Sequence, residues 1–332
     1  MKKKATKTIL LTGAGFTKNF GGFLAKEMWS KIFNHRLVEE YQKLRKLLCD
    51  DYDYESIYHK VLSGEFSIQE KGAITNAILA AYVSLDDVVR NWTFRQGAPY
   101  PVNIYGVNNF IRRFAGKNGE FGFFFTMNQD LFIERHFNDI RTGLGQPAIR
   151  RLIDQYMINL RLPIEKINYI SLPTKDMLQR DLNSYISGQT ICYIKLHGSY
   201  GWQSSDGKER LVIGRDKEKQ IQDEPLLSWY FELFKEALES KERKLFTIGY
   251  SFRDSHINKI IADSAINHGL KLYILSPEDP TKFMTNIKSV EYGEQIRSSI
   301  NKYYPYNLLD VFPSNQDDSH AWKEIIESYF TE

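Results

Sequence analysis

Two side chains of this sequence, Asn128 and His197, have a type and a setting that suit catalysis. Asn128 lies in the segment Thr126–Asp130, where its amide could hold a water molecule or a hydroxyl group, and the carboxylate of Asp130 could stabilise positive charge. His197 is followed by Gly198, and a histidine in this position could act as a general base. Plainer interpretations stay open, because Asn128 and Asp130 could cap backbone groups and a lone histidine is more often a structural hydrogen-bond donor.

A glycine-rich turn near the N-terminus, Gly13–Gly15, could bind phosphate. It follows a predicted strand and precedes an amphipathic helix that Thr17 or Asn19 could begin, so the backbone could approach a phosphate while helix N–H groups point at it. The pattern is weak by itself, and a second one, Gly143–Gly145, is interpreted as a turn. Lys18 stands where the dehydrogenase fingerprint has its third glycine, which disfavours an ordinary nicotinamide dehydrogenase.

Two further polar segments follow predicted strands in the C-terminal half. In Gly249–Asp254, the glycine and Ser251 suit phosphate or ribose binding, although Asp254 could instead simply cap the helix predicted at 255–262. Ser276 could contact the ribose of an adenosine or form a turn. The other histidines lie on predicted helices or at helix starts and have no comparable context: His35, His59, His136, His256, His268 and His320. Because the sequence has no His-x-x-x-His or Cys-x-x-Cys pair, it predicts no metal site.

Five short apolar runs must position these segments. Each run ends in glycine or polar residues, which is typical of buried parallel strands. The runs are Thr8–Thr12, Phe123–Thr126, Ile191–Leu196, Leu245–Ile248 and Leu272–Leu275. In open α/β sheets ligands bind beyond the carboxyl ends of the strands, so the five polar clusters form one natural site. The sequence therefore predicts an α/β fold with a Rossmann-like parallel sheet.

Long insertions are expected between these strands. The strands that end at Thr12 and begin at Phe123 are separated by far more than the roughly dozen residues that a crossover needs. Apolar residues at helical spacing predict helices at 23–33, 37–48 and 68–92, so we interpret 23–118 as a large inserted helical module. A second insertion, 131–189, is mixed, and an amphipathic helix at 320–330 ends the chain. We therefore expect one domain over 1–332 rather than two independent ones.

The composition narrows the class of protein. The chain has 332 residues, with 44 Lys and Arg against 41 Asp and Glu, and this near balance disfavours direct nucleic-acid binding. The only basic cluster is the N-terminal tail with Lys2, Lys3, Lys4 and Lys7. The longest plainly apolar stretch, 77–83, is far shorter than the roughly 18 residues of a membrane span. Cys49 and Cys192 exclude a disulfide framework and are most simply interpreted as buried thiols, so we expect a cytoplasmic protein.

Taken in order, these motifs resemble the sirtuin superfamily. Its members carry Gly-Ala-Gly-x-Ser, Thr-Gln-Asn-x-Asp, His-Gly and Gly-Thr-Ser segments. The matching segments here are Gly13–Thr17 with Thr for Ser, Thr126–Asp130 with Met127 for Gln, His197-Gly198, and Gly249–Ser251. The resemblance covers the sheet core and leaves out the helical insertions.

The departures from the superfamily pattern point to one branch of it. Its protein deacylases carry a four-cysteine zinc module before the Gly-Thr-Ser loop, whereas 212–245 holds no cysteine here. Gly21-Gly22-Phe23 stands in place of their Asp-Phe-Arg segment, which disfavours binding of acyl-lysine peptides. The sequence looks like the bacterial sirtuin-like branch that hydrolyses NAD in anti-phage defence. What that branch implies is cleavage of NAD to nicotinamide and ADP-ribose, triggered upon infection.

The resemblance also implies roles for particular residues. Asn128 would orient the water or a ribose hydroxyl, His197 would act as base, and Asp130 would hold the nicotinamide carboxamide. NAD would be the substrate, and no metal would take part. The phosphates and riboses would be bound by residues at the other strand ends: Gly13, Ala14, Gly15, Phe16, Thr17, Thr126, Gly249, Tyr250, Ser251, Asp254 and Ser276.

Other functions and the partners are left open at this point. The same cofactor could serve an NAD-dependent protein deacylase or ADP-ribosyltransferase, and a regulatory subunit could bind NAD or ADP-ribose without turnover. A freely active NAD hydrolase would kill its host, so we expect a homo-oligomer and a separate activating protein, such as a ring-forming ATPase. No membrane partner is expected.

Overall fold

Seven parallel strands form the central sheet, in the order β3-β5-β2-β1-β7-β8-β9. Their bounds are β1 Ala5–Thr12, β2 Phe121–Thr126, β3 Leu144–Gly145, β5 Ile191–Lys195, β7 Lys244–Ile248, β8 Lys271–Leu275 and β9 Ile300–Tyr304. A separate two-stranded sheet pairs β4 (Ile170–Ser171) with β6 (Trp202–Gln203). The computed structural model describes residues 5–92, 102–117, 120–137, 144–145, 147, 170–179, 190–204, 217–314 and 318–331.

The five predicted strands are present, and the predicted α/β fold with a Rossmann-like parallel sheet is confirmed. The prediction missed β9 and was wrong about Gly143–Gly145, because Leu144 and Gly145 form the edge strand β3 beside β5 instead of a turn. Gly143 lies outside the described residues. So do Lys2–Lys4 of the basic tail and most of the proposed insertion 131–189.

The strand ends are level with one another. Residue pairing runs across the sheet in a single row, which contains Lys195, Thr126, Thr12, Ile248 and Leu275. Each of these residues is the last of its strand. The segments that follow the five strands therefore begin at the same edge of the sheet.

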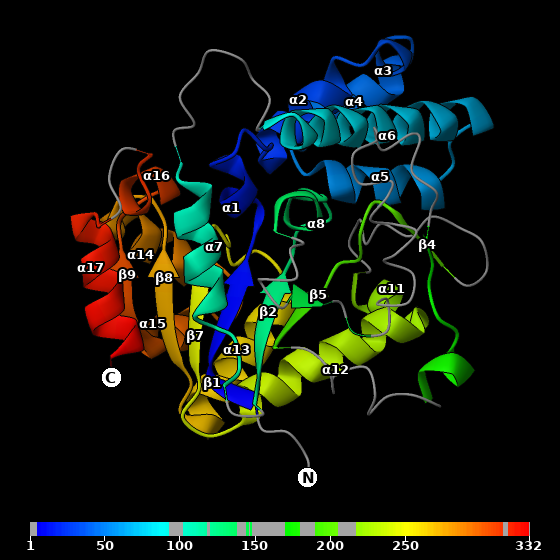
Figure 1. The fold of residues 1–332 in the computed structure, drawn as a ribbon. Coiled ribbons are helices and arrows are strands. Elements are labelled where there is room, and N and C mark those ends of the chain that lie inside the picture. The colour runs from blue at the N-terminus through cyan, green and yellow to red at the C-terminus, as the bar shows by residue number, and fades with distance from the viewer. Residues whose placement is uncertain are drawn as a thin grey trace.

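Helices cover both faces of the sheet (Figure 1). Successive side chains of a strand point to opposite faces. On one face, Phe246 of β7 contacts Phe110 of α7 (Ile104–Arg112) and Tyr329 in the C-terminal helical segment. On the other face, Phe125 of β2 contacts Phe234 of α12 (Pro225–Glu239). Both faces are thus buried, which explains why the strands are apolar runs without alternation.

A group of helices lies beyond the carboxyl ends of the strands, in the blue and cyan part of Figure 1. They are α2 Ala25–Phe33, α3 Arg36–Glu39, α4 Gln42–Asp50, α5 Tyr54–Ser63 and α6 Ile68–Arg90. The predicted helix at 37–48 is divided between α3 and α4, and α5 was not predicted. Ser67 begins α6 with a capping box in which its hydroxyl accepts a hydrogen bond from the Glu70 amide.

The long helix α6 lies at the centre of this group. Among the residues that the structure describes, it alone is long and apolar enough to cross a membrane, judged by length and composition. Half of its most apolar window is buried, and it packs against α2, α3, α5 and α8 (Phe132–His136). A core helix of a water-soluble domain has the same properties, and these contacts account for the apolar side chains of α6.

The remaining helices complete the layers around the sheet. They are α1 Ala14–Lys18, α11 Lys217–Asp223, α13 Ser255–His268, α14 Pro280–Lys288, α15 Gly293–Ser299, α16 Leu308–Val311 and α17 His320–Ile325, which continues as a π-helix over Ile326–Phe330. Of the two cysteines, Cys192 is buried in β5 as expected, whereas Cys49 is exposed, which corrects that prediction.

Candidate functional site

The loop after β1 and the loop after β7 touch backbone to backbone. The amide nitrogen of Gly13 donates to the carbonyl oxygen of Ile248 (3.0 Å), and that of Gly15 donates to the carbonyl oxygen of Gly249 (3.0 Å). A Cβ atom on Gly15 would lie 2.6 Å from Cα of Gly249, and one on Gly249 would lie 2.4 Å from Cα of Gly15. Gly249 also has a φ of +61°, a conformation that glycine adopts without strain. Two of the predicted motifs are therefore in direct contact.

This contact changes the expected role of the glycines. The sequence predicts N–H groups of Gly13–Gly15 that point at a phosphate, but the N–H groups of Gly13 and Gly15 are bonded to the β7 loop. Ala14 is the exposed residue of the turn, and as the first residue of α1 its N–H has no acceptor within the helix. The glycines serve close packing between two strand ends, and Ala14 is the residue of the turn that faces solvent.

The Asn128 side chain is held by the first loop. Its Nδ2 donates to the carbonyl oxygen of Gly13 (3.1 Å) and to Oγ1 of Thr17 (2.9 Å). A carbonyl oxygen can only accept, so the side-chain orientation is fixed with Nδ2 toward Gly13. Oδ1 then receives no hydrogen bond from any residue that the structure describes. Asn128 therefore offers a fixed acceptor to a water molecule or a hydroxyl group.

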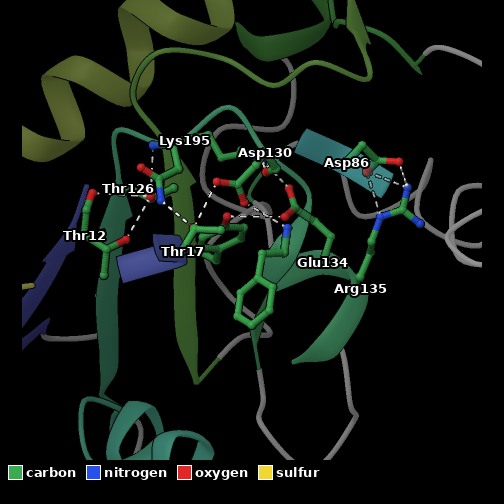
Figure 2. Close-up of polar contacts among 11 residues, drawn as sticks. Thr12, Thr17, Asp86, Thr126, Asp130, Glu134, Arg135 and Lys195 are labelled. Atoms are coloured by element: carbon green, nitrogen blue, oxygen red, sulfur yellow. Dashed lines mark hydrogen bonds and ion pairs between the residues drawn. The ribbon is translucent and has the colours of Figure 1, made fainter. Parts of the chain in front are cut away.

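Asp130 lies against the same threonine. Oγ1 of Thr17 donates to Oδ2 of Asp130 (3.0 Å), and the Phe132 amide donates to Oδ1 (3.0 Å), so the carboxylate also caps the start of α8 as one of the open interpretations has it. Burial raises the pKa of Asp130, and the nearby Lys195 ammonium opposes that shift. Figure 2 shows Thr17, Asp130, Lys195 and Glu134 around this point. Lys195 is buried and pairs with Glu134 at 2.7 Å.

The segment after β2 is also tied to the segment after β5. The Gln129 side chain donates from Nε2 to the carbonyl oxygen of His197 (3.1 Å), and the carbonyl oxygen of Gln129 accepts from the Tyr200 amide (3.0 Å). Oε1 of Gln129 accepts from the hydroxyl of Tyr82 on α6 (2.8 Å). The residue next to Asn128 thus fixes the backbone of His197.

The His197 side chain meets a second histidine that the sequence interpretation discounted. Nε2 of His197 lies 3.1 Å from Nε2 of His256, the second residue of α13, and the Asp254 carboxylate lies within 4.8 Å of both. Both rings are buried. The expectation that His256 lies apart from the strand-end segments is corrected, because the fold places its ring against that of His197 at the end of β5. These three residues could also hold a metal ion.

The titration of the two histidines follows from burial. Burial lowers the pKa of His197 to about 3, and it lowers that of His256 to about 4, while Asp254 opposes both shifts. Each ring is therefore neutral at physiological pH. Only one N–H can lie between the two Nε2 atoms, so one ring donates this hydrogen bond and the other accepts it. A neutral His197 is in the form required of a base.

Asp254 belongs to a partly buried charge network. Lys217 of α11 donates to Oδ1 of Asp254 at 2.9 Å and pairs with Glu55 of α5 at 2.7 Å. Burial opposes ionisation of Asp254, but His197 and Lys217 outweigh it and leave the pKa below its usual value. The interpretation of Asp254 as a simple helix cap is wrong, because its side chain makes no capping hydrogen bond to α13.

The other predicted site residues have varied surroundings. Phe16 is fully buried against Phe20 and Phe132, so its ring belongs to the core. Thr126 accepts from the Thr12 hydroxyl (2.9 Å), a pair shown in Figure 2, and from the Asn128 amide (3.1 Å). The hydroxyl of Tyr250 is buried and donates to Oδ1 of Asn258 (3.1 Å).

Two serines complete the predicted set. Ser251 is exposed at the strand-end edge and is free to meet a ligand. The Ser276 amide donates to the carbonyl oxygen of Tyr304 at the end of β9 (3.1 Å), and the Ser276 hydroxyl accepts from the Glu278 amide (3.4 Å). Of the two serines, the solvent-facing Ser251 is therefore the better placed for a ligand.

Several residues of this region escaped the sequence interpretation. Gln129 lies inside a motif that was noticed, yet only the structure shows that it binds the His197 backbone. Glu55 comes from the proposed insertion 23–118 and Lys217 from the segment between β6 and β7, and neither has a motif of its own. His256 had one available signal: it follows Asp254 by two residues at the start of a helix, directly after a strand-end loop.

The region that carries most of these segments is similar to a known protein family. A family model described as a SIR2-like domain matches residues 122–296, which include the segments after β2, β5, β7 and β8. No curated protein matches the chain in sequence.

Proposed function

The chain belongs to the SIR2-like domain family, whose members are NAD-dependent enzymes, and on that premise we propose that it is an NAD glycohydrolase. The reaction breaks the bond between C1′ of the ribose and the nicotinamide nitrogen, and the bonding electrons leave with the nicotinamide, which becomes neutral. Water then bonds to C1′, its proton is lost, and the products are nicotinamide and ADP-ribose.

The observation that carries this proposal is the fixed amide of Asn128. Its two N–H groups are used by Gly13 and Thr17, and Oδ1 is left to accept from water or from a ribose hydroxyl. An oxocarbenium-like ribose needs a water molecule held on one side and little other chemistry. An acceptor fixed by two hydrogen bonds orients water without first having to be ordered itself.

His197 supplies the second part of the proposal. Its imidazole is unprotonated at physiological pH, the form that can accept the proton of a ribose hydroxyl, and the nearby Asp254 carboxylate raises its proton affinity. The Asp254 carboxylate nearby would stabilise the imidazolium that forms. Asn128 and His197 follow adjacent strands and are joined through Gln129, which places both groups at one edge of the sheet.

The other strand ends would hold the rest of the dinucleotide. We assign the phosphates to the exposed turn residue Ala14 and to Ser251, and the nicotinamide carboxamide to Asp130. Gly13, Gly15 and Gly249 would contribute by keeping the two loops close together. Because Met127 stands where the superfamily has glutamine, the ribose contacts would differ from the family pattern.

The experiment is to incubate the purified chain with NAD and to quantify nicotinamide and ADP-ribose by liquid chromatography. We expect Asn128→Ala and His197→Ala to lower the rate roughly 100-fold or more. Asn34→Ala and His268→Ala, which alter the C-cap of α2 and the last residue of α13 outside the site, serve as matched controls. Full activity of both site variants would remove the mechanism. Transfer of an acyl group to ribose would indicate a protein deacylase instead. Tight binding of intact NAD without turnover would indicate a regulatory subunit.

We further propose a biological setting, an effector of abortive infection in anti-phage defence that acts in the cytoplasm. Its activity would be controlled by homo-oligomerisation and by a separate activating protein such as a ring-forming ATPase, without direct nucleic-acid or membrane binding. The motivation is that uncontrolled loss of NAD is lethal. Light scattering coupled to size-exclusion chromatography tests the first part, and a monomer at every concentration would argue against self-assembly. Product analysis with the neighbouring gene co-expressed tests the second part.

A further inference from the structure

Three potential metal ligands converge at the end of β5. They are a ring nitrogen of His197, a carboxylate oxygen of Asp254 and a ring nitrogen of His256, and all three atoms lie within 4.8 Å of one another. The two Nε2 atoms are 3.1 Å apart. All three residues are largely enclosed, with His197 and His256 buried. Their spacing along the chain, with 197 far from 254 and 256, matches no linear metal-binding motif.

The donor set has a recognisable chemical preference. Two imidazoles and one carboxylate suit Zn²⁺ and neighbouring divalent transition metals more than Mg²⁺ or Ca²⁺, which prefer oxygen ligands. Two nitrogen ligands that each lie about 2.0–2.1 Å from one Zn²⁺ ion can be 3.1 Å apart, as they are here. Three protein ligands leave one position of a tetrahedral ion open.

We propose that His197, Asp254 and His256 form a binding site for a divalent transition-metal ion, and that the bound ion inhibits NAD cleavage by occupying the nitrogen with which His197 would act as base. The inhibition is built on the proposed function, whereas metal binding stands on the geometry alone. The ion would hold the enzyme in an inactive form, which answers the need to restrain a hydrolase that consumes NAD.

The charges around the cluster favour a cation. Lys217 lies between Glu55 and Asp254, so this group of three carries two carboxylates against one ammonium. Lys217 engages Oδ1 of Asp254, and the carboxylate keeps a second oxygen for another partner. The net negative charge beside two neutral rings lowers the cost of bringing a divalent ion into a buried place.

Histidine binds metals through a ring nitrogen of the neutral imidazole. Each neutral ring carries a single N–H and can place it on Nδ1, which frees Nε2 for the ion. Metal binding would thus replace the hydrogen bond between the two rings without removing a proton from either.

The test measures metal binding directly. The metal-free protein, prepared with EDTA and desalted, is dialysed against Zn²⁺, and bound zinc is counted by inductively coupled plasma mass spectrometry. We expect one Zn²⁺ per chain, a raised melting temperature, and binding weakened roughly 10-fold or more in His256→Gln. Gln keeps an amide nitrogen near the position of Nε2 but is a poor ligand. His268→Gln, on the same helix α13, should bind zinc as the wild type does.

A second variant and circular dichroism protect the test against misfolding. Asp254→Asn removes the carboxylate charge with little change of shape, so it should also weaken zinc binding while the spectrum stays native. No zinc bound by the wild type would overturn the proposal. Equal binding by His256→Gln and the wild type would also overturn it, because the ion would then lie elsewhere and the two rings would form only a hydrogen-bonded pair.

The activity arm separates this inference from the proposed function. With NAD as substrate, Zn²⁺ should slow nicotinamide release by the wild type, EDTA should restore it, and His256→Gln should need roughly 10-fold more Zn²⁺ for the same inhibition. If the protein binds zinc through His256 but does not cleave NAD, the proposed function is wrong and the metal site still stands. Cleavage that Zn²⁺ leaves unchanged would overturn the inhibition.

Discussion

The amide nitrogen of Gly15 donates a hydrogen bond to the carbonyl oxygen of Gly249 at 3.0 Å. This bond joins the turn after β1 to the turn after β7, two points of the chain that lie far apart in the sequence. Asn128 is then fixed by the first turn through Gly13 and Thr17. The position of the amide that carries the proposed chemistry thus depends on close contact between two glycine turns.

Gly249→Ala should therefore disturb both stability and activity. The added Cβ would lie 2.4 Å from backbone atoms of Gly15, at a φ of +61°. Backbone strain and overlap together should lower the free energy of unfolding by roughly 3 kcal/mol or more. Urea unfolding measures the first effect and nicotinamide release the second.

Gly269→Ala is the matched control for this substitution. Gly269 has a φ of +71° at the end of α13, but a Cβ there meets nothing within 4 Å. Gly269→Ala should lower the free energy of unfolding only by the strain of alanine in a left-handed conformation, about 1–2 kcal/mol, and leave NAD cleavage unchanged. If both substitutions lowered the free energy of unfolding by the same amount, the contact between the two turns would contribute nothing measurable to stability.

Gly72→Ala should stabilise the protein. Gly72 lies inside α6, and a Cβ added there meets nothing within 4 Å. Alanine restricts the unfolded chain more than glycine does, so the free energy of unfolding should rise by about 0.5–1 kcal/mol. A higher midpoint in urea checks this, and a lower one would mean that α6 is distorted at this position.

Arg135→Ala should be strongly destabilising. Arg135 of α8 binds Asp86 of α6 through Nε (3.0 Å) and Nη2 (2.8 Å), and the two side chains are 2% and 4% exposed (Figure 2). Removing one partner leaves a buried charge, which costs about 3–5 kcal/mol. Urea unfolding of Arg135→Ala, Asp86→Ala and the double variant gives the coupling energy.

The double variant decides how this pair acts. The main cost of each single substitution is the charged partner that stays buried without its counter-ion. The double variant Asp86→Ala/Arg135→Ala should therefore lower the free energy of unfolding by clearly less than the sum of the two single changes. Additive losses would show that the two side chains contribute independently of each other. The exposed pair Lys259–Asp263 is a useful reference, because removing either partner there should change little.

Asp130→Asn should alter how stability depends on pH. Burial raises the pKa of Asp130 in the folded protein, so the folded state holds this proton to higher pH than the unfolded state does. The stability gained from that proton is present at acidic pH and is lost as the pH rises through the raised pKa. The variant has no such loss, and Lys195 keeps Glu134 as its partner.

We therefore expect the stability of Asp130→Asn relative to the wild type to rise as the pH increases from acidic values through the raised pKa, while NAD cleavage falls. Urea unfolding as a function of pH checks the first expectation. Asp263→Asn, at a more exposed carboxylate of α13, controls for the general loss of a negative charge. A difference between Asp130→Asn and the wild type that stayed constant with pH would contradict the argument.

Much of the sheet could be predicted because its chemistry is local. A strand that is buried on both faces must be apolar throughout, and β2 and β5 are therefore visible as short runs that stop at polar residues. The strand β9 lies at the edge of the sheet and has exposed residues at Asn301 and Lys302, so no apolar run marks it. The helix α5 was also missed, although its buried residues Tyr54, Ile57 and Val61 recur at helical spacing.

The sequence by itself determined the order of the strand-end motifs and which side chains each strand end would present. Asn128, Asp130 and His197 follow apolar strands, and that much depends only on neighbours along the chain. The tertiary structure decided what these side chains meet. It bonded Gly15 to Gly249 and thereby used N–H groups expected to face phosphate, and it set His256 against His197. Contacts between residues far apart in sequence depend on how strands pair and helices pack, and no local pattern encodes them.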